Sequence, residues 1–217
     1  MYVYKLPSVY IGNVVKRPSK TSKTPYVADV ILENDNTEYM AHTAALGCCG
    51  MVDSGKQVIM RDSPNPKNVC KYKIMLANTI ERGLSNIVGV DPGIAEDLVE
   101  NCIKQNLITN LSNVKKYKKQ QTISNSRFDF IGIDENNTCF ILEVKNVPLA
   151  DYVDCYAKER KKMDFSNREI NSKIAYFPDG YRKKQKDTVS PRALKHITEL
   201  TKIKLDKKEK IRCIMCY

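Results

Sequence analysis

The fold of the second half of this chain is decided by residues 125–146, which read NSRFDFIGIDENNTCFILEVKN. Two runs rich in β-branched and aromatic residues, 127–134 and 138–146, stand on either side of the polar sequence Asp134-Glu135-Asn136-Asn137. Such runs are typical of strands, and Asp and Asn between them are typical of a tight turn. The stretch therefore predicts a β-hairpin.

Polar side chains interrupt this apolar hairpin. Side chains two residues apart share one face of a strand, so Glu143 and Lys145 point the same way, and the turn brings Asp129 beside Glu143. Mg²⁺ or Mn²⁺ prefers oxygen ligands and keeps several waters, so Asp129, Glu143 and the carbonyl of Val144 suffice as ligands. A metal held there would polarise a phosphodiester, while Lys145 orients the attacking water. The alternative is a surface hairpin with an ordinary Glu–Lys pair.

The first 80 residues predict a small barrel. They contain five short β-rich segments separated by turn-forming sequences. Five short strands in this length favour an OB-like β-barrel, a fold that binds oligonucleotides, and we expect residues 1–80 to form such a nucleic-acid-binding domain. The segments are 9–16, 26–33, 38–43, 57–61 and 71–77.

Residues 81–217 predict a mixed α/β domain, because a helix, strands, a second helix and a final strand follow one another. Asp91-Pro92 is a helix-start signal, with Asp as the cap and Pro at the first helical position. We expect the domain boundary between Ala77 and Gly89. The expected elements besides the hairpin are a helix with the apolar stripe Ile94, Leu98, Val99 and Cys102, a strand at 117–124, a helix from Ser190-Pro191 past Leu200, and a strand at 211–217.

The net charge of +11 favours a polyanionic partner, with nucleic acid as the first choice and an anionic membrane surface as the second. Three lysine-rich clusters, 115–119, 158–162 and 182–186, fall in the second domain and are candidate phosphate contacts. Within the first of them we assign Lys116 and Lys118 to nucleic-acid binding. A solvated basic face is the alternative for each cluster.

Several other classes of protein find no support. No apolar run approaches the ~18 residues that span a bilayer, and Met1–Tyr10 does not resemble a secretion signal. We therefore expect an intracellular protein with eight reduced cysteines and no membrane partner. The sequence does not decide whether the protein forms oligomers. We interpret Cys213-x-x-Cys216 as part of a strand. Residues 50–57 look like a P-loop, but Gln57 stands where Mg²⁺ binding requires Ser or Thr.

The pair Asp129 and Glu143-Val144-Lys145 resembles the core of PD-(D/E)xK nucleases. More narrowly, residues 125–130 and 143–147 look like those of the sugar fermentation stimulation protein A (SfsA) family. The resemblance extends over most of the chain. It includes Ala28-Asp29-Val30 with Ala41-His42, Asn65-Pro66-Lys67 with Tyr72, Leu98-Val99-Glu100, Phe177-Pro178-Asp179 and Lys195-His196.

The resemblance implies an N-terminal OB-like barrel, a C-terminal restriction-endonuclease-like α/β/α domain and DNA binding. It makes Glu100 the third carboxylate of the metal site and the catalytic centre. It also places Arg127 at the scissile phosphate or against Asp129. For His196 the alternatives are a contact to phosphate, support of the metal site, and a capping or packing role in its helix. The remaining nucleic-acid contacts implied by the matching segments are Asn125, Lys67, Tyr72 and Lys195.

The expected function is that of a metal-dependent endonuclease. Two alternatives stay open at this point. One is a regulator that binds DNA on the same fold without cleaving it. The other is a protein that binds or cleaves RNA through the barrel.

Overall fold

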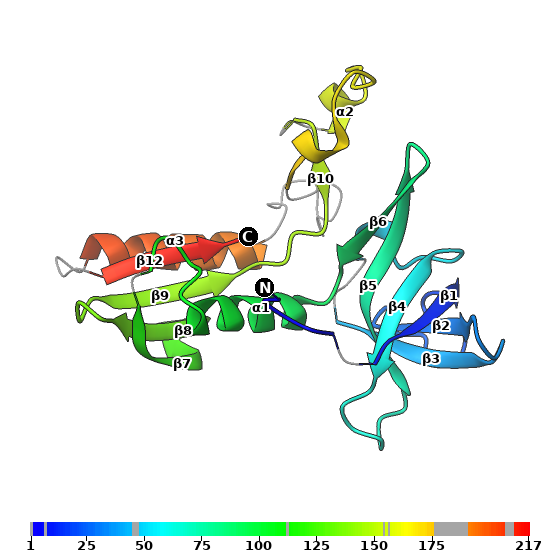
Figure 1. Cartoon of the computed structure of the whole chain (residues 1–217), viewed down its shortest axis with the longest axis horizontal. Coiled ribbons are helices and arrows are strands. Elements are labelled where there is room, and N and C mark those ends of the chain that lie inside the picture. Colours follow the sequence, from blue (N-terminus) through cyan, green and yellow to red (C-terminus); the bar gives the residue numbers. More distant parts are fainter. Residues whose placement is uncertain are drawn as a thin grey trace. The chain divides into compact units, whose positions relative to one another are not determined.

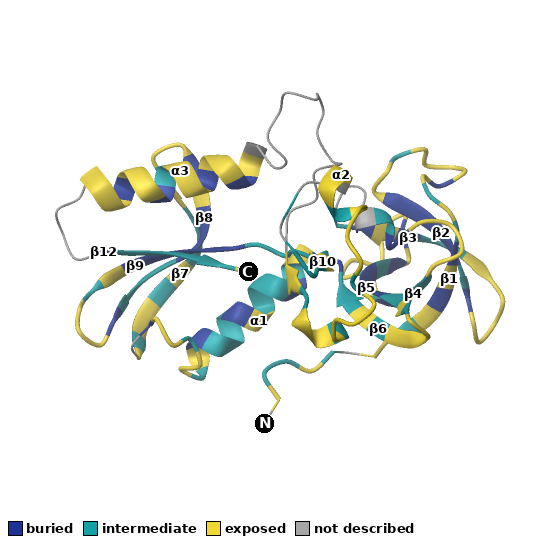
Figure 2. Cartoon of the chain, turned by 90° about the horizontal axis from the view of Figure 1, so that it is seen from above, coloured by how far each residue is buried: buried dark blue, intermediate teal, exposed yellow. Residues whose placement is uncertain are grey.

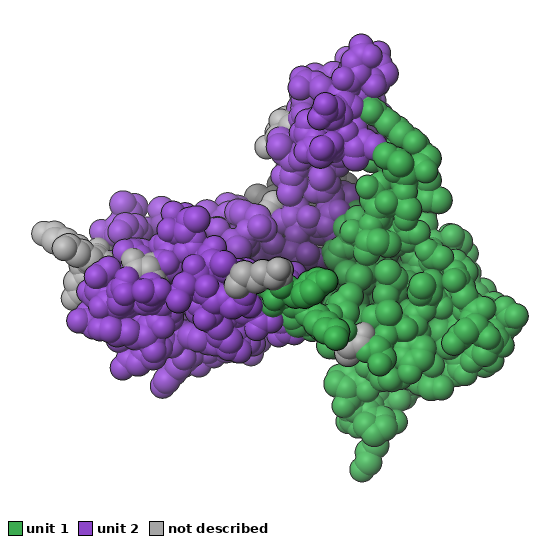
Figure 3. Space-filling view, viewed as in Figure 1, with its two compact units in different colours: residues 1–95 green, residues 96–217 purple. Residues whose placement is uncertain are grey.

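The computed structural model describes residues 2–6, 8–44, 48–111, 113–153, 155, 157–175, 191–206 and 211–217. The chain forms two compact units, Met1–Ala95 and Glu96–Tyr217 (Figure 3). The expected mixed α/β class, with a barrel followed by a sheet-and-helix domain, is confirmed.

The first unit is a closed barrel of five strands (Figure 1). Strand β1 pairs with β2 and β4, β2 pairs with β3, and β4 pairs with β5, all antiparallel. A parallel pairing between β3 and β5 closes the ring. Alternate side chains fill the interior, among them Val14, Val30, Val58, Met60 and Ile74. The strands of this unit are β1 (Tyr10–Lys16), β2 (Val27–Leu32), β3 (Glu38–Thr43), β4 (Gln57–Asp62), β5 (Tyr72–Glu81) and β6 (Leu84–Gly89), with a 3₁₀ turn at Cys48–Gly50.

The sixth strand of this unit moves the boundary away from the expected position. β6 forms a hairpin with β5, from Glu81↔Leu84 to Leu76↔Gly89, so residues 81–89 belong to the first unit. The division falls at Ala95, inside the first helix, and residue 80 lies within β5. The short segment Leu84–Gly89 mixes polar and apolar residues without clear alternation, which is why it looks like a linker in the sequence.

The second unit is a four-stranded sheet with the order β12-β9-β8-β7, and the strand pairs are antiparallel except for the parallel pair β9–β12. Figure 2 shows this sheet edge-on between α3 and α1. Its main elements are α1 (Pro92–Lys104), β7 (Val114–Ile123), β8 (Ser126–Asp134), β9 (Cys139–Val144), α3 (Pro191–Asp206) and β12 (Ile211–Cys216). Shorter elements are β10 (Ala150–Asp151), α2 (Ala157–Arg160), a 3₁₀ turn at Ile170–Ser172 and β11 (Ile174–Ala175).

The local signals in the sequence act as expected. Asp91 caps α1, because its Oδ1 accepts a hydrogen bond from the backbone N–H of Gly93 at 3.1 Å. Asp134 closes the β8–β9 hairpin, since its Oδ1 accepts from the backbone N–H groups of Asn136 and Thr138 at 2.9 and 2.8 Å. All cysteines whose side chains the structure describes are free thiols.

The core between α3 and the sheet is built from Phe128, Ile141, Leu200, Ile203 and Ile211. These side chains are buried and come from β8, β9, α3 and β12. On the other side of the sheet, α1 buries Val99 and Ile103, whereas Leu98, which was expected in the buried stripe, is 38% exposed.

Gly132 tests the packing of the β8–β9 hairpin. A Cβ at this position would lie 2.4 Å from the backbone oxygen of Lys116 and 2.7 Å from the ring of Phe140. Gly132→Ala should therefore lower the free energy of unfolding by about 1–3 kcal/mol, measured by urea denaturation. Gly93→Ala is the matched control, because its Cβ meets its nearest neighbour at 3.4 Å and should leave stability unchanged or slightly higher. Equal stabilities of the two variants would contradict this packing.

Candidate active site

The position of Asp129 depends on a break in the alternation of β8. The Phe130 ring lies 5.9 Å from that of Tyr117, on the side of α1, whereas Phe128 packs against the α3 core. In an unbroken strand these two side chains would share one face. Opposite Asp129 in β7, Gln120 has a φ of +53°. The strand pair is therefore distorted at Gln120 and Asp129.

This distortion ties the Asp129 carboxylate to both neighbouring strands. Oδ2 accepts a hydrogen bond from the backbone N–H of Val144 at 2.7 Å, and Oδ1 accepts from the Gln120 side chain at 2.9 Å. The same Nε2 of Gln120 also donates to Glu96 Oε2 on α1, at 2.8 Å. Gln120 thus joins two carboxylates from different elements.

Glu143 lies beside this pair and is almost completely buried, with 1% of its surface exposed. Its Oε1 accepts hydrogen bonds from the Lys145 ammonium and from Nδ1 of His196 on α3. Its Oε2 is buried and has no hydrogen-bond partner among the described residues. Lys145 also donates to the carbonyl of Val144, at 3.2 Å. The expected convergence of Asp129, Glu143 and Lys145 is therefore present in the structure.

Burial raises the pKa of both carboxyl groups that bond to Gln120. The pKa of Asp129 is raised first by burial and also by the charge of Glu143, against the opposing hydrogen bond from Val144. The pKa of Glu96 is raised first by burial and then by the charge of Asp129. Negative charge is therefore unfavourable at this position unless a cation compensates it.

The structure brings Glu96, and not Glu100, to this site. Glu100 accepts hydrogen bonds from Tyr117 at 2.9 Å and Lys119 at 2.8 Å, and it forms an ion pair with Lys104 at 3.1 Å. The hydrogen bond from Lys119 is the main reason that the pKa of Glu100 falls from 4.5 to about 2. The two glutamates are one turn apart on the same helix face, so the sequence alone could not decide between them. Nothing in the sequence singled out Gln120.

Two residues assigned to nucleic-acid contact are buried instead. Tyr72 is 3% exposed, with its ring 4.8 Å from Tyr10 and 5.3 Å from Tyr39 inside the end of the barrel. His196 is 5% exposed and bonds to Glu143, which agrees with a supporting role at the site rather than a surface contact. Both positions were chosen from family resemblance, which does not report burial.

The other assigned contacts lie at the surface. Lys195 donates to the backbone oxygen of Asn125 at 2.6 Å, which fixes the β7–β8 turn against α3. The cluster 182–186 and the segment 177–179 lie outside the described residues. The assigned contacts that are exposed are Asn125, Arg127, Lys67, Lys116, Lys118 and Lys195.

The donor set is suited to a hard cation, although it offers few protein ligands. Among the described residues, no group of three or more His, Cys, Asp or Glu side chains has the arrangement of a metal cage. Mg²⁺, however, needs only one or two carboxylates together with waters. Asp129, Glu143 and the Val144 carbonyl supply oxygen only, and no donor in the described ranges reaches Glu143 Oε2. These residues fit a divalent cation.

The fold and this site agree with one protein family. A family model described as "Sugar fermentation stimulation protein RE domain" matches residues 93–217. Because this match covers more than half of the chain, the chain belongs to the sugar fermentation stimulation protein (SfsA) family. In the described ranges, no helix combines the length and the apolar character needed to cross a membrane.

Relatives of known sequence and structure extend the similarity to the barrel. A sugar fermentation stimulation protein homolog of Clostridium novyi is 30% identical over 152 residues, which are 70% of this chain and 62% of that protein. A homolog from Alteromonas mediterranea is 29% identical over 91% of this chain and 70% of its own length. The chain thus spans about three-fifths of the Clostridium novyi protein. A solved structure of Pyrococcus furiosus SfsA covers 99% of this chain and 75% of its own, with a TM-score of 0.69 and 16% identity, which shows a shared fold.

Glu96 and Glu100 should respond oppositely to removal of their charge. The pKa of Glu96 is raised in the folded state, so its ionised form costs stability above that pKa and the cost disappears in acid. Glu96→Gln should therefore be more stable than the native protein at pH 7.5 in EDTA, by about 0.5 kcal/mol or more, and equally stable near pH 4.

The depressed pKa of Glu100 contributes stability above pH 4.5, which is lost as the pH falls towards about 2. Glu100→Gln should accordingly destabilise by about 1–2 kcal/mol at pH 7.5, after allowance for the half-exposed Lys104. Thermal unfolding of both variants between pH 4 and 8 measures the difference. Shifts of the same sign at pH 7.5 would contradict the assigned environments.

Proposed function

We propose that this protein is a divalent-cation-dependent nuclease acting on DNA. The observation that carries the proposal is the excess of carboxylate over cation at one point, where two of the three carboxylates are buried. Asp129, Glu143 and Glu96 converge there, and among the described residues Lys145 is the one lysine or arginine that bonds to any of them. Buried charges in proteins are paired or bind metal, so this excess indicates a cation site.

The ligands would be Asp129, Glu143 and the carbonyl of Val144. A cation held by these oxygens would polarise a phosphodiester and lower the pKa of a bound water. Glu96, held by Gln120, would bind a water of the cation's outer shell. The solved structure of Pyrococcus furiosus SfsA is a complex with Ca²⁺, another oxygen-preferring cation, and this supports the proposal of a hard divalent ion here.

Lys145 supplies the remaining positive charge. Its ammonium now bonds to Glu143 Oε1 and Val144 O, two of the oxygens that we assign to the cation. Its side chain is 18% exposed, so the ammonium can reach solvent and donate to a phosphate oxygen or to the attacking water. His196, which is buried and bonds to Glu143 Oε1, would keep that carboxylate in place.

Basic residues on the same sheet support a polyanionic substrate. Lys116 and Lys118 are exposed on β7, which is the edge strand of the sheet, and Arg127 is exposed on neighbouring β8. These side chains would contact phosphates, in agreement with the net charge of +11.

Loss of a carboxylate ligand of the cation, or of Lys145, should suppress DNA cleavage without abolishing DNA binding. Asp129→Ala, Glu143→Gln and Lys145→Ala should each lower the rate of plasmid nicking in Mg²⁺ or Mn²⁺ by at least about 100-fold, because each removes a charge assigned to the reaction. Gel analysis of supercoiled and single-stranded DNA measures the rate, with EDTA as the blank.

Glu135→Gln is the matched control, since Glu135 is exposed in the turn of the same hairpin. Circular dichroism of every variant verifies folding. Tight, salt-sensitive binding without cleavage by the native protein would instead identify a binding protein on this fold. Preferential cleavage of RNA of equal length would assign the site to RNA.

The contribution of β7 can be measured by salt dependence. The double variant Lys116→Ala/Lys118→Ala should bind duplex DNA more weakly at low salt, and its plot of log affinity against log salt should be shallower by about 1–2. Lys5→Ala/Lys56→Ala removes the same charge from exposed positions of the first unit and should have a smaller effect on the slope. Equal slopes for the two double variants would exclude β7 as the phosphate contact.

A further inference from the structure

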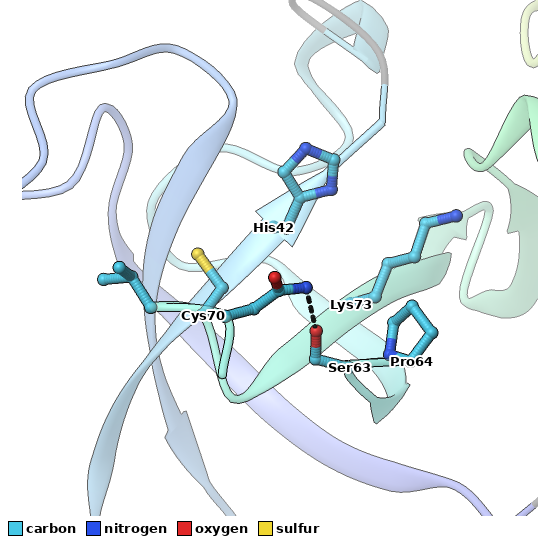
Figure 4. Close-up of a pocket in the computed structure, with 7 residues that line it drawn as sticks. His42, Ser63, Pro64, Cys70 and Lys73 are labelled. Atoms are coloured by element: carbon cyan, nitrogen blue, oxygen red, sulfur yellow. Dashed lines mark hydrogen bonds between the residues drawn. The ribbon is translucent and has the colours of Figure 1, made fainter. Parts of the chain in front are cut away.

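The barrel carries a pocket of about 450 Å³ that is separate from the nuclease-like site (Figure 4). His42 from β3 and Lys73 from β5 are direct partners in the parallel pairing that closes the barrel. The connection between β4 and β5 supplies the other lining residues. These are Ser63, Pro64, Asn68, Val69 and Cys70.

Charged groups in the pocket are neutralised. The Lys73 ammonium lies 2.6 Å from Asp91 Oδ2, and Asp91 is buried. Partial loss of hydration, and then the charge of Lys73, lowers the pKa of His42, so its ring is neutral at neutral pH. Burial raises the pKa of the Cys70 thiol, which is therefore protonated. A pocket of this kind suits a neutral ligand better than a free anion or a metal ion.

The walls combine apolar surface with a polar edge. Pro64 and Cys70 contribute apolar surface, and the lining residue Val69 is 78% exposed. Asn68 Nδ2 donates to Ser63 Oγ at 2.8 Å, which leaves the amide oxygen, the second amide hydrogen and the hydroxyl hydrogen available. Figure 4 shows the labelled loop residues Ser63, Pro64 and Cys70 together with Lys73, and the ring of His42 above them. Apolar walls with both donors and acceptors match a flat heterocycle.

We propose that this pocket receives the base of an unpaired nucleotide. The proposal rests on the proposed function in one respect, namely that the partner is a nucleic acid. The loop between strands 4 and 5 of an OB-like barrel is one of the loops that contact oligonucleotides in this fold, and the volume lies within the range of small-ligand sites. Lys67 and Lys71, exposed on the same connection, lie where they can contact the flanking phosphates.

The pocket consequently favours single strands. A base inside a duplex has its polar edge paired and its faces stacked, so it cannot enter. A base at a gap, a flap or a single-stranded end is free to do so at little cost. The barrel would then direct the protein to DNA with unpaired nucleotides.

The test compares three fluorescent probes of equal length in EDTA: a single-stranded oligonucleotide, the same backbone with abasic sites throughout, and a blunt duplex. The native protein should bind the single strand more tightly than the abasic strand. Asn68→Ala and His42→Ala should each weaken single-strand binding about five- to tenfold, which corresponds to the loss of one base contact. Binding of the abasic strand and of the duplex should stay within twofold.

Asn86→Ala is the matched control, because Asn86 is partly exposed on β6 and does not line the pocket. Equal weakening of single-stranded and abasic probes would overturn the inference in favour of a phosphate site. Unchanged binding of the single strand by both pocket variants would also overturn the inference. The proposed function would still stand in that case if the native protein bound the duplex and cleaved DNA in a metal-dependent way. Failure of the native protein to bind any of the three probes would overturn the proposed function, and this inference with it.

Discussion

The hydrogen bond from the backbone N–H of Val144 to the Asp129 carboxylate is the constraint on which the candidate site depends. The ladder between β8 and β9 runs from Ile133↔Cys139 to Phe130↔Leu142 and would next join Asp129 to Glu143. At this point the Asp129 side-chain oxygen, and not a backbone carbonyl, accepts the hydrogen bond from the Val144 N–H. The two strands stay together, while the carbonyl of Val144 and the carboxylate of Glu143 remain available at the end of the ladder. The positive φ of Gln120 on the other side of β8 belongs to the same distortion.

Local sequence signals were sufficient for the elements and for the pair of acids. The five barrel strands, the helix start at Asp91-Pro92 and the hairpin turn at Asp134 each depend on neighbouring residues, and all were predicted within a few residues of their observed limits. Asp129, Glu143 and Lys145 could be brought together because a hairpin has one register and strands alternate with a period of two. The class of fold followed from the order of these elements.

Choices that depend on tertiary packing could not be predicted. Lys119 and Tyr117 on β7 donate hydrogen bonds to Glu100, which leaves Glu96 as the glutamate beside Asp129. No pattern along the helix predicts this choice. The burial of Tyr72 follows from its packing between Tyr10 and Tyr39, which come from two other strands. The pairing of β6 with β5 could not be predicted from the sequence, because the six residues of β6 show no clear alternation of polar and apolar side chains.

The barrel pocket and the site beside Asp129 differ in how their charges are compensated. This difference is the strongest physical argument that the two units have different functions. At the pocket of the barrel each charge is cancelled, since Lys73 pairs with Asp91 and the conditions around His42 and Cys70 favour their neutral forms. Beside Asp129 the charge is left unbalanced. The pKa values of Asp129 and Glu96 are raised, and one buried oxygen of Glu143 has no donor within the described part of the chain. A protein gains nothing in stability from such an excess, because desolvated carboxylates that repel each other weaken the folded state. Such a group of carboxylates is retained where a bound cation compensates the negative charge. The unfavourable electrostatics of the site without a cation are therefore themselves an argument that the site binds one.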